Sequence, residues 1–485
     1  MSTATATAPV AEDGLFSPRY RGSSLSFAGV MFLVGFAALA LVTTMPVAVK
    51  ALDGLSLYPL AFGGFVTTGL FGSVLAGRLT DRLGPGRPLA AGLSLSVVAL
   101  LVCGGAGSIW QLIAGRCLDG LAGGLVVVAV NVTVARTYPS GLRPRALSLM
   151  SVCWIVPSMA GPPIAGLVTA AASWRWVFLG LAALTAAVAL ASTVLAQRQI
   201  AGARGTAASG TAASGTAADG TAADGGGSVH GRNRVRLAAV VAVGAGLIEY
   251  AGSGTHLVQL ASAVVGVALL APTAPRLLPR GALRAATGIP AVVLLSGISS
   301  GVYFTLESFV PLLLINHRQV PVSLAGTAFT GATIGWAGAS WLQGHVWSRV
   351  PRTRLVAIGT TMIVAASVVA ALGVPGSAPP LTAALALVVA GAGMGLAAPS
   401  LTVLVFEYCR PEEQGQYGAA LQVAQSLGQV LVMGLAGALY DAGAANARNA
   451  GEAFVAVFAL LFAVAVAARA LAPRTRSNTV PHTGG

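Results

Sequence analysis

Three charged side chains lie within long apolar stretches of the sequence, where a charge is costly. Arg116 and Asp119 stand three residues apart in one stretch, and Glu307 stands well inside another. Residues at i and i+3 share one face of a helix, and a charge in hydrocarbon costs on the order of 3 kcal/mol by insertion scales. Because desolvation favours the neutral carboxylic acid, we expect Asp119 and Glu307 to bind and release protons, with Arg116 sensing the state of Asp119.

Plainer interpretations of these charges stay open. Arg116 and Asp119 can form a self-neutralising structural pair, and Glu307 can be a hydrogen-bonded structural acid. Glu249 is expected to play no such part, because it stands near the outer end of its apolar stretch and should reach interfacial water.

Polar and aromatic residues at helical spacing indicate a cavity. Gln422, Gln425 and Gln429 stand at i, i+3 and i+7, which places them on one helix face. The further residues expected to line the cavity are Asn131, Tyr303, Thr327, Thr330, Thr333 and Trp336. Amides, aromatic rings and little fixed positive charge suit an amphipathic or cationic organic molecule better than a phosphate ester. A sugar would require more polar side chains.

The composition excludes an ordinary soluble enzyme. Of 485 residues, 55% are apolar and 9% are charged, whereas soluble chains carry about 25% charged residues. The net charge of +14 does not indicate nucleic-acid binding, because the basic residues form no dense patch with interleaved aromatics. The cysteines have no metal-ligand spacing and are interpreted as small buried side chains. We therefore expect no metal and no cofactor.

Apolar stretches of membrane-spanning length recur along the chain, since a bilayer core of about 30 Å needs roughly 20 residues per helix. The sequence predicts an all-α polytopic membrane protein with spans near residues 28–50, 59–80, 88–107, 110–136, 146–171, 175–196, 237–254, 257–274, 291–314, 322–347, 355–375, 380–405, 416–440 and 453–472. The seventh and eighth spans are the shortest of the set. This threading gives fourteen spans.

The basic residues predict the orientation of these spans. Twenty-three of them fall on the side of the N-terminus and four on the opposite side, with Arg116 inside a span. Because basic residues accumulate in cytoplasmic loops, both termini are predicted to be cytoplasmic. The first 25 residues lack the order of a signal peptide, so the first span is expected to be retained. Lys50 is the single lysine, a bias typical of high-GC bacterial coding, which points to a bacterial plasma membrane.

A repetitive segment divides the chain into two halves. Residues 205–224 read GTAAS, GTAAS, GTAAD, GTAAD, and without large apolar side chains they cannot offset their ordering entropy. The predicted organisation is a cytoplasmic tail (1–27), a six-helix bundle (28–197), a flexible linker (198–236), an accessory two-helix hairpin (237–284), a second six-helix bundle (285–474) and a C-terminal tail (475–485). A docking role for the linker stays open beside that of a plain tether.

The loop after the second span carries charges and glycines at close spacing, namely Gly77, Asp81, Arg82, Gly84 and Arg87. Glycines let two helix ends approach, and a carboxylate can accept hydrogen bonds from arginines or from a helix N-terminus. The loop resembles the G-x-L-x-D-R-x-G-R signature of the major facilitator superfamily, with one residue inserted before the last arginine. The resemblance implies an inner gate, in which Asp81 and Arg82 latch two bundles together. A static topology anchor is the alternative.

Two further segments resemble motifs of the same superfamily. The segment from Arg116 to Gly124 is similar to R-x-x-Q-G-x-G, with Asp119 in place of the glutamine. Gly161, Pro162 and Gly166 resemble the G-P-x-x-G-G antiporter motif, with alanine in the penultimate position. Proline kinks a helix and small residues permit tight helix contacts. Within the superfamily this motif implies export, and a packing kink is the alternative interpretation.

The resemblance implies a fold of two six-helix bundles plus an inserted hairpin, similar to the fourteen-span drug:proton antiporter branch. That branch usually carries an aspartate in the first span, whereas residues 40–48 read ALVTTMPVA. The implied function is proton-driven export of a lipophilic or cationic small molecule by a monomer in the lipid bilayer. Transport of an envelope lipid or a nutrient is the first alternative. A polytopic membrane enzyme is the second, although the sequence offers no acid-rich metal cluster, nucleophile elbow or sizeable soluble loop.

Overall fold

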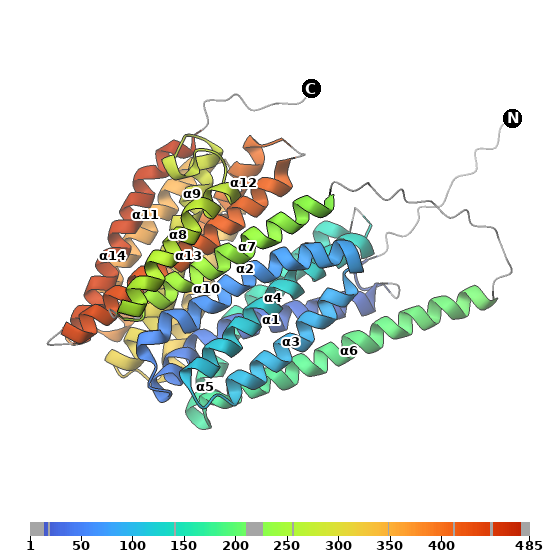
Figure 1. The fold of residues 1–485 in the computed structure, drawn as a ribbon, viewed down its shortest axis with the longest axis horizontal. Coiled ribbons are helices and arrows are strands. Elements are labelled where there is room, and N and C mark those ends of the chain that lie inside the picture. Colours follow the sequence, from blue (N-terminus) through green and yellow to red (C-terminus); the bar gives the residue numbers. More distant parts are fainter. Residues whose placement is uncertain are drawn as a thin grey trace.

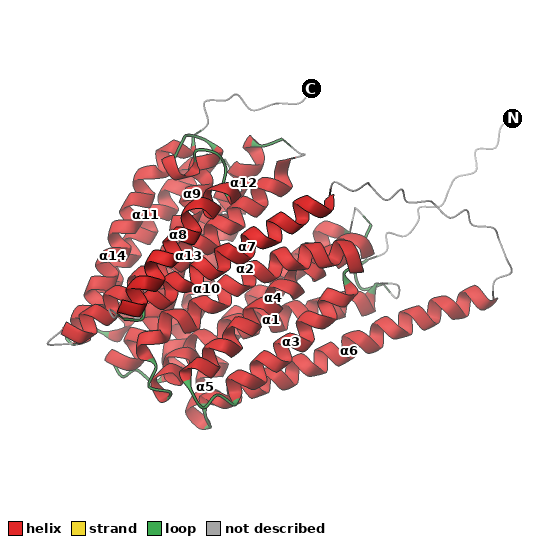
Figure 2. Ribbon diagram, in the orientation of Figure 1, coloured by secondary structure: helices red, strands yellow, loops and turns green. Residues whose placement is uncertain are grey.

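The computed structural model describes residues 14–17, 20–139, 142–209, 227–254, 257–347, 349–410, 413–446 and 450–476. In this part of the chain every element of regular secondary structure is a helix (Figure 2). The α-helices are α1 (Arg21–Ala51), α2 (Tyr58–Leu83), α3 (Gly86–Gly104), α4 (Ile109–Thr137), α5 (Arg143–Ala171), α6 (Trp174–Ser209), α7 (Gly227–Ala251), α8 (Leu257–Leu277), α9 (Ile289–Leu312), α10 (Val322–His345), α11 (Arg352–Leu372), α12 (Pro380–Tyr408), α13 (Gln414–Asn446) and α14 (Ala450–Leu471).

Each predicted apolar stretch overlaps one of these helices. Eleven candidate spans among the described residues are long and apolar enough to cross a membrane. The stretches of α5, α7 and α10 are not among those eleven, so the prediction of fourteen spans stays a prediction. The prediction of an all-helical membrane protein is confirmed.

The helices pack as two groups joined along a seam (Figure 1). In the first group α4 packs on α2 and α3, and α1 packs on α5 and α6. In the second group α12 packs on α10 and α11, and α9 packs on α13. Helix α10 meets α5, and α13 meets α2, across the seam. We call the end of the bundle where α1 begins and α14 ends the near end, and the opposite end, which carries the loop between α1 and α2, the far end.

Glycines set the distance between α2 and α4. A Cβ on Gly120 would overlap the carbonyl oxygen of Phe65, and a Cβ on Gly124 would overlap the carbonyl oxygen of Gly69. The two helices therefore touch backbone to backbone, as small residues permit in membrane helix pairs. Asp119 precedes Gly120 in the sequence, so this contact fixes the position of Asp119 along α2.

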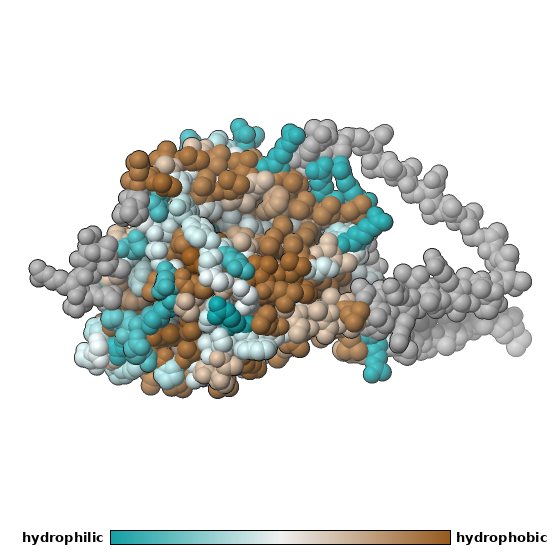
Figure 3. Space-filling model, turned by 60° about the horizontal axis from the view of Figure 1, so that its bottom comes forward, coloured by the Kyte–Doolittle hydropathy of each residue, from teal (hydrophilic) through white to brown (hydrophobic). Residues whose placement is uncertain are grey.

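Apolar side chains form broad patches, mixed with polar ones, on the face of the molecule seen in Figure 3. On α8, Leu257 is 82% exposed and Val264 is 69% exposed. Exposed apolar area of this extent is expensive in water, whereas hydrocarbon accepts it. The outward faces of these helices thus suit a lipid environment.

The predicted flexible linker coincides in part with helix. Helix α6 continues to Ser209 and α7 begins at Gly227. Residues 210–226, which hold the last three of the four repeat units, lie outside the described residues. The flexibility of the linker stays a prediction.

Candidate functional site

Two consecutive prolines leave backbone acceptors free in the middle of α5. Pro162 and Pro163 have no N–H group, so they cannot donate to the carbonyl groups one turn earlier in the helix. Those carbonyls belong to Ser158 and Met159. In a low-dielectric interior, a carbonyl without a donor is costly, so α5 requires donors from another element at this height.

Helix α10, from the second group of helices, supplies these donors. The hydroxyl of Thr330 donates to the carbonyl oxygen of Met159 at 2.7 Å. The hydroxyl of Thr333 lies 3.3 Å from the carbonyl oxygen of Ser158 and 3.3 Å from that of Phe329 in its own helix, so its one proton is shared between them. Thr330 was expected to line a cavity, and the structure places it at the seam. Thr333 was likewise expected to line a cavity, and its hydroxyl also lies at the seam. The contact with α5 was not predicted, and the signal that could have found it is the match between proline positions in α5 and hydroxyls in α10.

Glycines bring the two backbones into contact at the same level. A Cβ on Gly326 of α10 would lie 2.7 Å from the carbonyl oxygen of Pro162. A Cβ on Gly166 would lie 2.9 Å from the Cα of Ser323. The far halves of α5 and α10 are therefore closed against each other. The antiporter-like motif lies at the contact between the two groups of helices, and two of its residues, Pro162 and Gly166, make that contact.

Glu307 is buried beside this seam. It is 3% exposed and lies on α9, one turn after Tyr303, which interacts with its carboxylate. The Tyr303 ring lies 5.1 Å from the Trp336 ring, centroid to centroid. From the other group of helices, the Tyr58 hydroxyl donates to the carbonyl oxygen of Ser308 at 2.8 Å.

Within the described part of the chain, no basic side chain forms an ion pair with the Glu307 carboxylate. An ionised carboxylate in such a place is strongly disfavoured unless it is paired or hydrated. The closed arrangement of Tyr303, Glu307 and Trp336 therefore suits the neutral acid.

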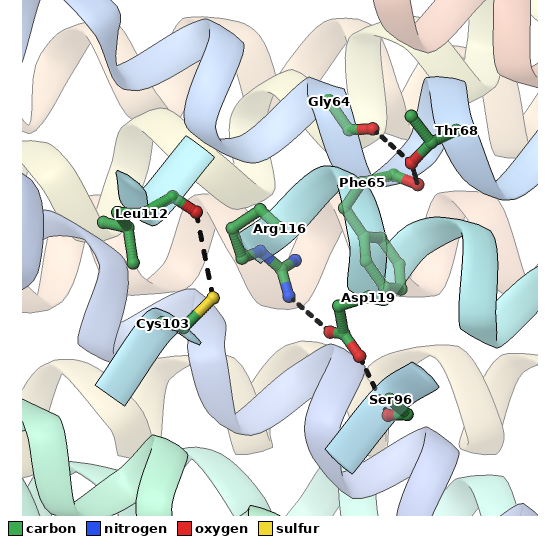
Figure 4. Close-up of polar contacts among 8 residues, drawn as sticks. All are labelled: Gly64, Phe65, Thr68, Ser96, Cys103, Leu112, Arg116 and Asp119. Carbon is green, nitrogen blue, oxygen red and sulfur yellow. Dashed lines mark hydrogen bonds and ion pairs between the residues drawn. The ribbon is translucent and has the colours of Figure 1, made fainter. Parts of the chain in front are cut away.

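Arg116 and Asp119 form a direct ion pair inside the first group of helices (Figure 4). The Arg116 Nη1 lies 2.9 Å from Asp119 Oδ2, and the Ser96 hydroxyl donates to Asp119 Oδ1 at 3.1 Å. The guanidinium carbon of Arg116 lies 4.4 Å from the centroid of the Phe65 ring. Both charged residues are almost fully buried. The pair neutralises itself, and the ring adds a cation–π contact.

A cavity of about 20 Å³ adjoins Asp119. It is lined by residues of α1, α2, α3, α4 and α6 that include Ser96, Asp119 and Thr185. This volume holds about one water molecule. The cavity lies within the first group of helices, so Asp119 faces the interior of that group, whereas Glu307 faces the seam.

The predicted inner-gate residues lie at the near end and are open to solvent. Asp81, Arg82 and Arg87 are exposed. In the part of the chain that the structure describes, no hydrogen bond or ion pair is recorded for Asp81. Gly84 has φ +76°, a conformation that favours glycine. Gly77 has open space around it.

The amide residues are placed on different surfaces. Gln425 Nε2 donates to the Ser296 hydroxyl of α9 at 2.9 Å. Gln429 is half-buried, while Gln422 and Asn131 are exposed. Their joint role in a cavity stays a prediction.

The expectation for Glu249 is wrong. Its side chain is fully buried, 0% exposed, between α7 and α2 rather than in interfacial water. Glu249 lies near the end of its predicted span, but α7 packs against α2 at this point and buries the side chain.

Comparisons with known proteins agree with this geometry. A family model described as Major Facilitator Superfamily matches residues 25–433 and 292–484. A probable multidrug-efflux transporter of Mycobacterium tuberculosis is 28% identical over 477 residues, covering 93% of this chain and 94% of the relative. Among solved structures, a POT family transporter has a TM-score of 0.69 at 11% identity, covering 94% of this chain and 97% of that one. A D-xylose-proton symporter has a TM-score of 0.63 at 13% identity, covering 95% and 100%.

Proposed function

The chain belongs to the major facilitator superfamily, and we propose that it exports a lipophilic or cationic small molecule in exchange for protons. The relative described as a probable multidrug-efflux transporter, which matches nearly the whole chain, supports this cargo class. We further propose that the protein acts as a monomer with fourteen spans in a bacterial plasma membrane, with both termini in the cytoplasm.

The burial of the Glu307 carboxylate at the seam is the single observation that carries the proposal. This carboxylate interacts with Tyr303 of its own helix and with Tyr58 of the other group of helices. The neutral acid is compatible with a closed, dry seam, and the ionised form requires water or a cation. Binding and release of a proton at Glu307 therefore favour different arrangements of the two groups of helices. This is the differential stabilisation that couples a ligand to a conformational change.

The aromatic rings near Glu307 support a cationic cargo. Tyr303 and Trp336 contact each other next to the acid. When the seam opens, their faces and the carboxylate can hold a lipophilic cation by cation–π and charge interactions. A cation and a proton would then compete for one carboxylate, and this competition produces exchange rather than joint transport.

The seam supports a mechanism of alternating access. Far-end closure rests on the threonine hydrogen bonds and on the contact of Gly326 with Pro162. At the near end, the exposed side chains of Asp81 and Arg82 suit a released latch. In the opposite conformation we expect the latch to form and the far-end contacts to separate.

Purified protein in liposomes tests this function. A fluorescent lipophilic cation should move against its gradient when a pH gradient is imposed, and a protonophore should abolish that movement. Uptake of the dye with the proton gradient would instead favour import of a nutrient. Covalent turnover of an added lipid, without any transport, would favour a membrane enzyme.

A further inference from the structure

Glu249 is a buried acid that the proposed mechanism does not use. It lies near the far end of α7, and its side chain is 0% exposed. The Thr67 hydroxyl of α2 donates to Oε2 at 3.5 Å, and Oε1 has no hydrogen-bond partner. A buried polar oxygen without a partner is costly, so this position requires a reason other than stability.

The structure holds a recess for this carboxylate. A Cβ on Gly63 of α2 would overlap the carboxylate of Glu249, so the absence of a side chain at position 63 makes the space. Thr67 lies one turn further along the same face and is also buried. The acid of α7 is therefore seated in α2, a helix of the first group.

The same end of α7 also contacts the second group of helices. A Cβ on Gly252 would overlap the carbonyl oxygen of Gly434 on α13, and a Cβ on Gly434 would lie 3.2 Å from the carbonyl oxygen of Ile248. Helix α7 packs on α2 and on α13 (Figure 1). Since α2 and α13 belong to different groups, any rocking of one group against the other changes at least one of these contacts.

The titratable groups that face Glu249 carry no opposite charge. The thiol of Cys117 on α4 interacts electrostatically with the Glu249 carboxylate. Arg116 is turned to Asp119. On α2 and α8 the charged side chains begin at Arg78 and at Arg276, several turns from the recess.

The remaining titratable neighbours lie on α13 and on α7 itself. On α13 the charge of Asp441 acts on Tyr440. On α7 the Tyr250 ring lies 5.9 Å from the ring of Trp110, centroid to centroid. No described group compensates a negative charge in the recess.

We propose that Glu249 is a second proton-binding site, whose neutral acid seats the α7–α8 hairpin in α2 and whose proton is released when α7 leaves the recess. The inference rests on the proposed proton exchange and adds a carboxylate to it. The balance is one proton bound and released per movement of α7. Glu307 and Glu249 then act at different contacts of the same seam.

Infrared spectroscopy of the purified protein in lipid discs tests the proposal without any cargo. The carbonyl stretch of a protonated carboxylic acid is followed from about pH 5 to about pH 10, a range that covers buried glutamates. Glu249→Gln should remove one titrating component of the band, and Glu307→Gln should remove another. If Glu249→Gln leaves the band and its titration unchanged, or if the component it removes is constant at every pH, the proposal is wrong.

Variants of the recess make the test specific. Gly63→Ala should displace the carboxylate into a wetter place and lower the pH at which its component disappears. Gly246→Ala on α7 is the matched control, because a Cβ there meets open space and should leave the titration unchanged. Should Glu249→Gln not fold, Thr67→Val removes the recorded donor and should shift the frequency of the same component. An unshifted component in Thr67→Val and an unchanged titration in Gly63→Ala would each overturn the proposal.

The two proposals fail in distinguishable ways. If proton-driven exchange is absent in liposomes while the Glu249 component titrates, the exchange function falls and the proton site stands. If exchange is present while no Glu249 component titrates, the second site falls and the exchange function stands.

Discussion

The hydroxyl of Thr330 donates to the carbonyl oxygen of Met159 at 2.7 Å, across the contact between α10 and α5. Pro163 deprives that carbonyl of its helical donor, so a residue from one group of helices completes the backbone of the other. The prolines of the antiporter-like motif therefore favour closure of the far end. When the two groups separate, the carbonyl oxygen of Met159 loses its donor and has to be hydrated.

The first prediction concerns the threonines of the seam. Thr330→Val with Thr333→Val should favour separation of the far ends, because each hydrogen bond contributes about 1 kcal/mol net, or roughly a fivefold change in population per bond. Distances between spin labels at Ala172 and Ser377, which lie in exposed far-end loops, should lengthen. Thr327→Val is the control, because its hydroxyl bonds to Leu324 in its own helix. Equal label distances in the double variant and the control would contradict the role of the seam.

The second prediction concerns the glycine contact. Gly326→Ala should prevent full closure, since its Cβ would lie 2.7 Å from a backbone oxygen that cannot rotate away. We expect a loss of transport of at least tenfold with the protein still present in the membrane. Gly338→Ala on the same helix meets open space and should transport normally. Full activity of Gly326→Ala would show that the contact is not needed.

The third prediction separates structure from coupling at the ion pair. Asp119→Asn leaves the Arg116 guanidinium buried and unpaired, and breaking a buried pair costs about 3–5 kcal/mol. Thermal unfolding in detergent should therefore show a large loss for Asp119→Asn and a smaller loss when Arg116→Gln is added. If the double variant loses, relative to the unsubstituted protein, the sum of the losses of the two single variants, the two charges do not interact.

The fourth prediction concerns the near-end loop. Asp81→Ala should slow turnover without weakening cargo binding, because its side chain is exposed in this conformation and acts in the opposite one. Flux in liposomes and binding in detergent measure the two effects separately. Wild-type turnover would count against a latch at Asp81.

The sequence predicts well those features that depend on neighbouring residues. The i, i+3 spacing of Arg116 and Asp119 is sufficient to place them in contact, and it does. The predicted stretches overlap the helices because a long apolar run in hydrocarbon must satisfy its own backbone. Glu307 lies well within such a run and is buried.

Features that depend on distant segments were not predictable from one sequence. The burial of Glu249 arises from a glycine 186 positions earlier in the chain, at Gly63. The partner of Thr330 is decided by Pro163 on another helix. Asp119 faces a cavity inside the first group of helices rather than the seam, because the close packing of α2 on α4 sets its direction. Such relations require the tertiary arrangement.

Proton-driven exchange by Glu307→Gln is the most direct test of the central claim. Glutamine keeps the size of the side chain and cannot release a proton. With a fluorescent lipophilic cation in liposomes, the variant should lose exchange driven by a pH gradient while it retains cargo-for-cargo counterflow in the absence of a gradient. Undiminished pH-driven exchange by Glu307→Gln would contradict the account.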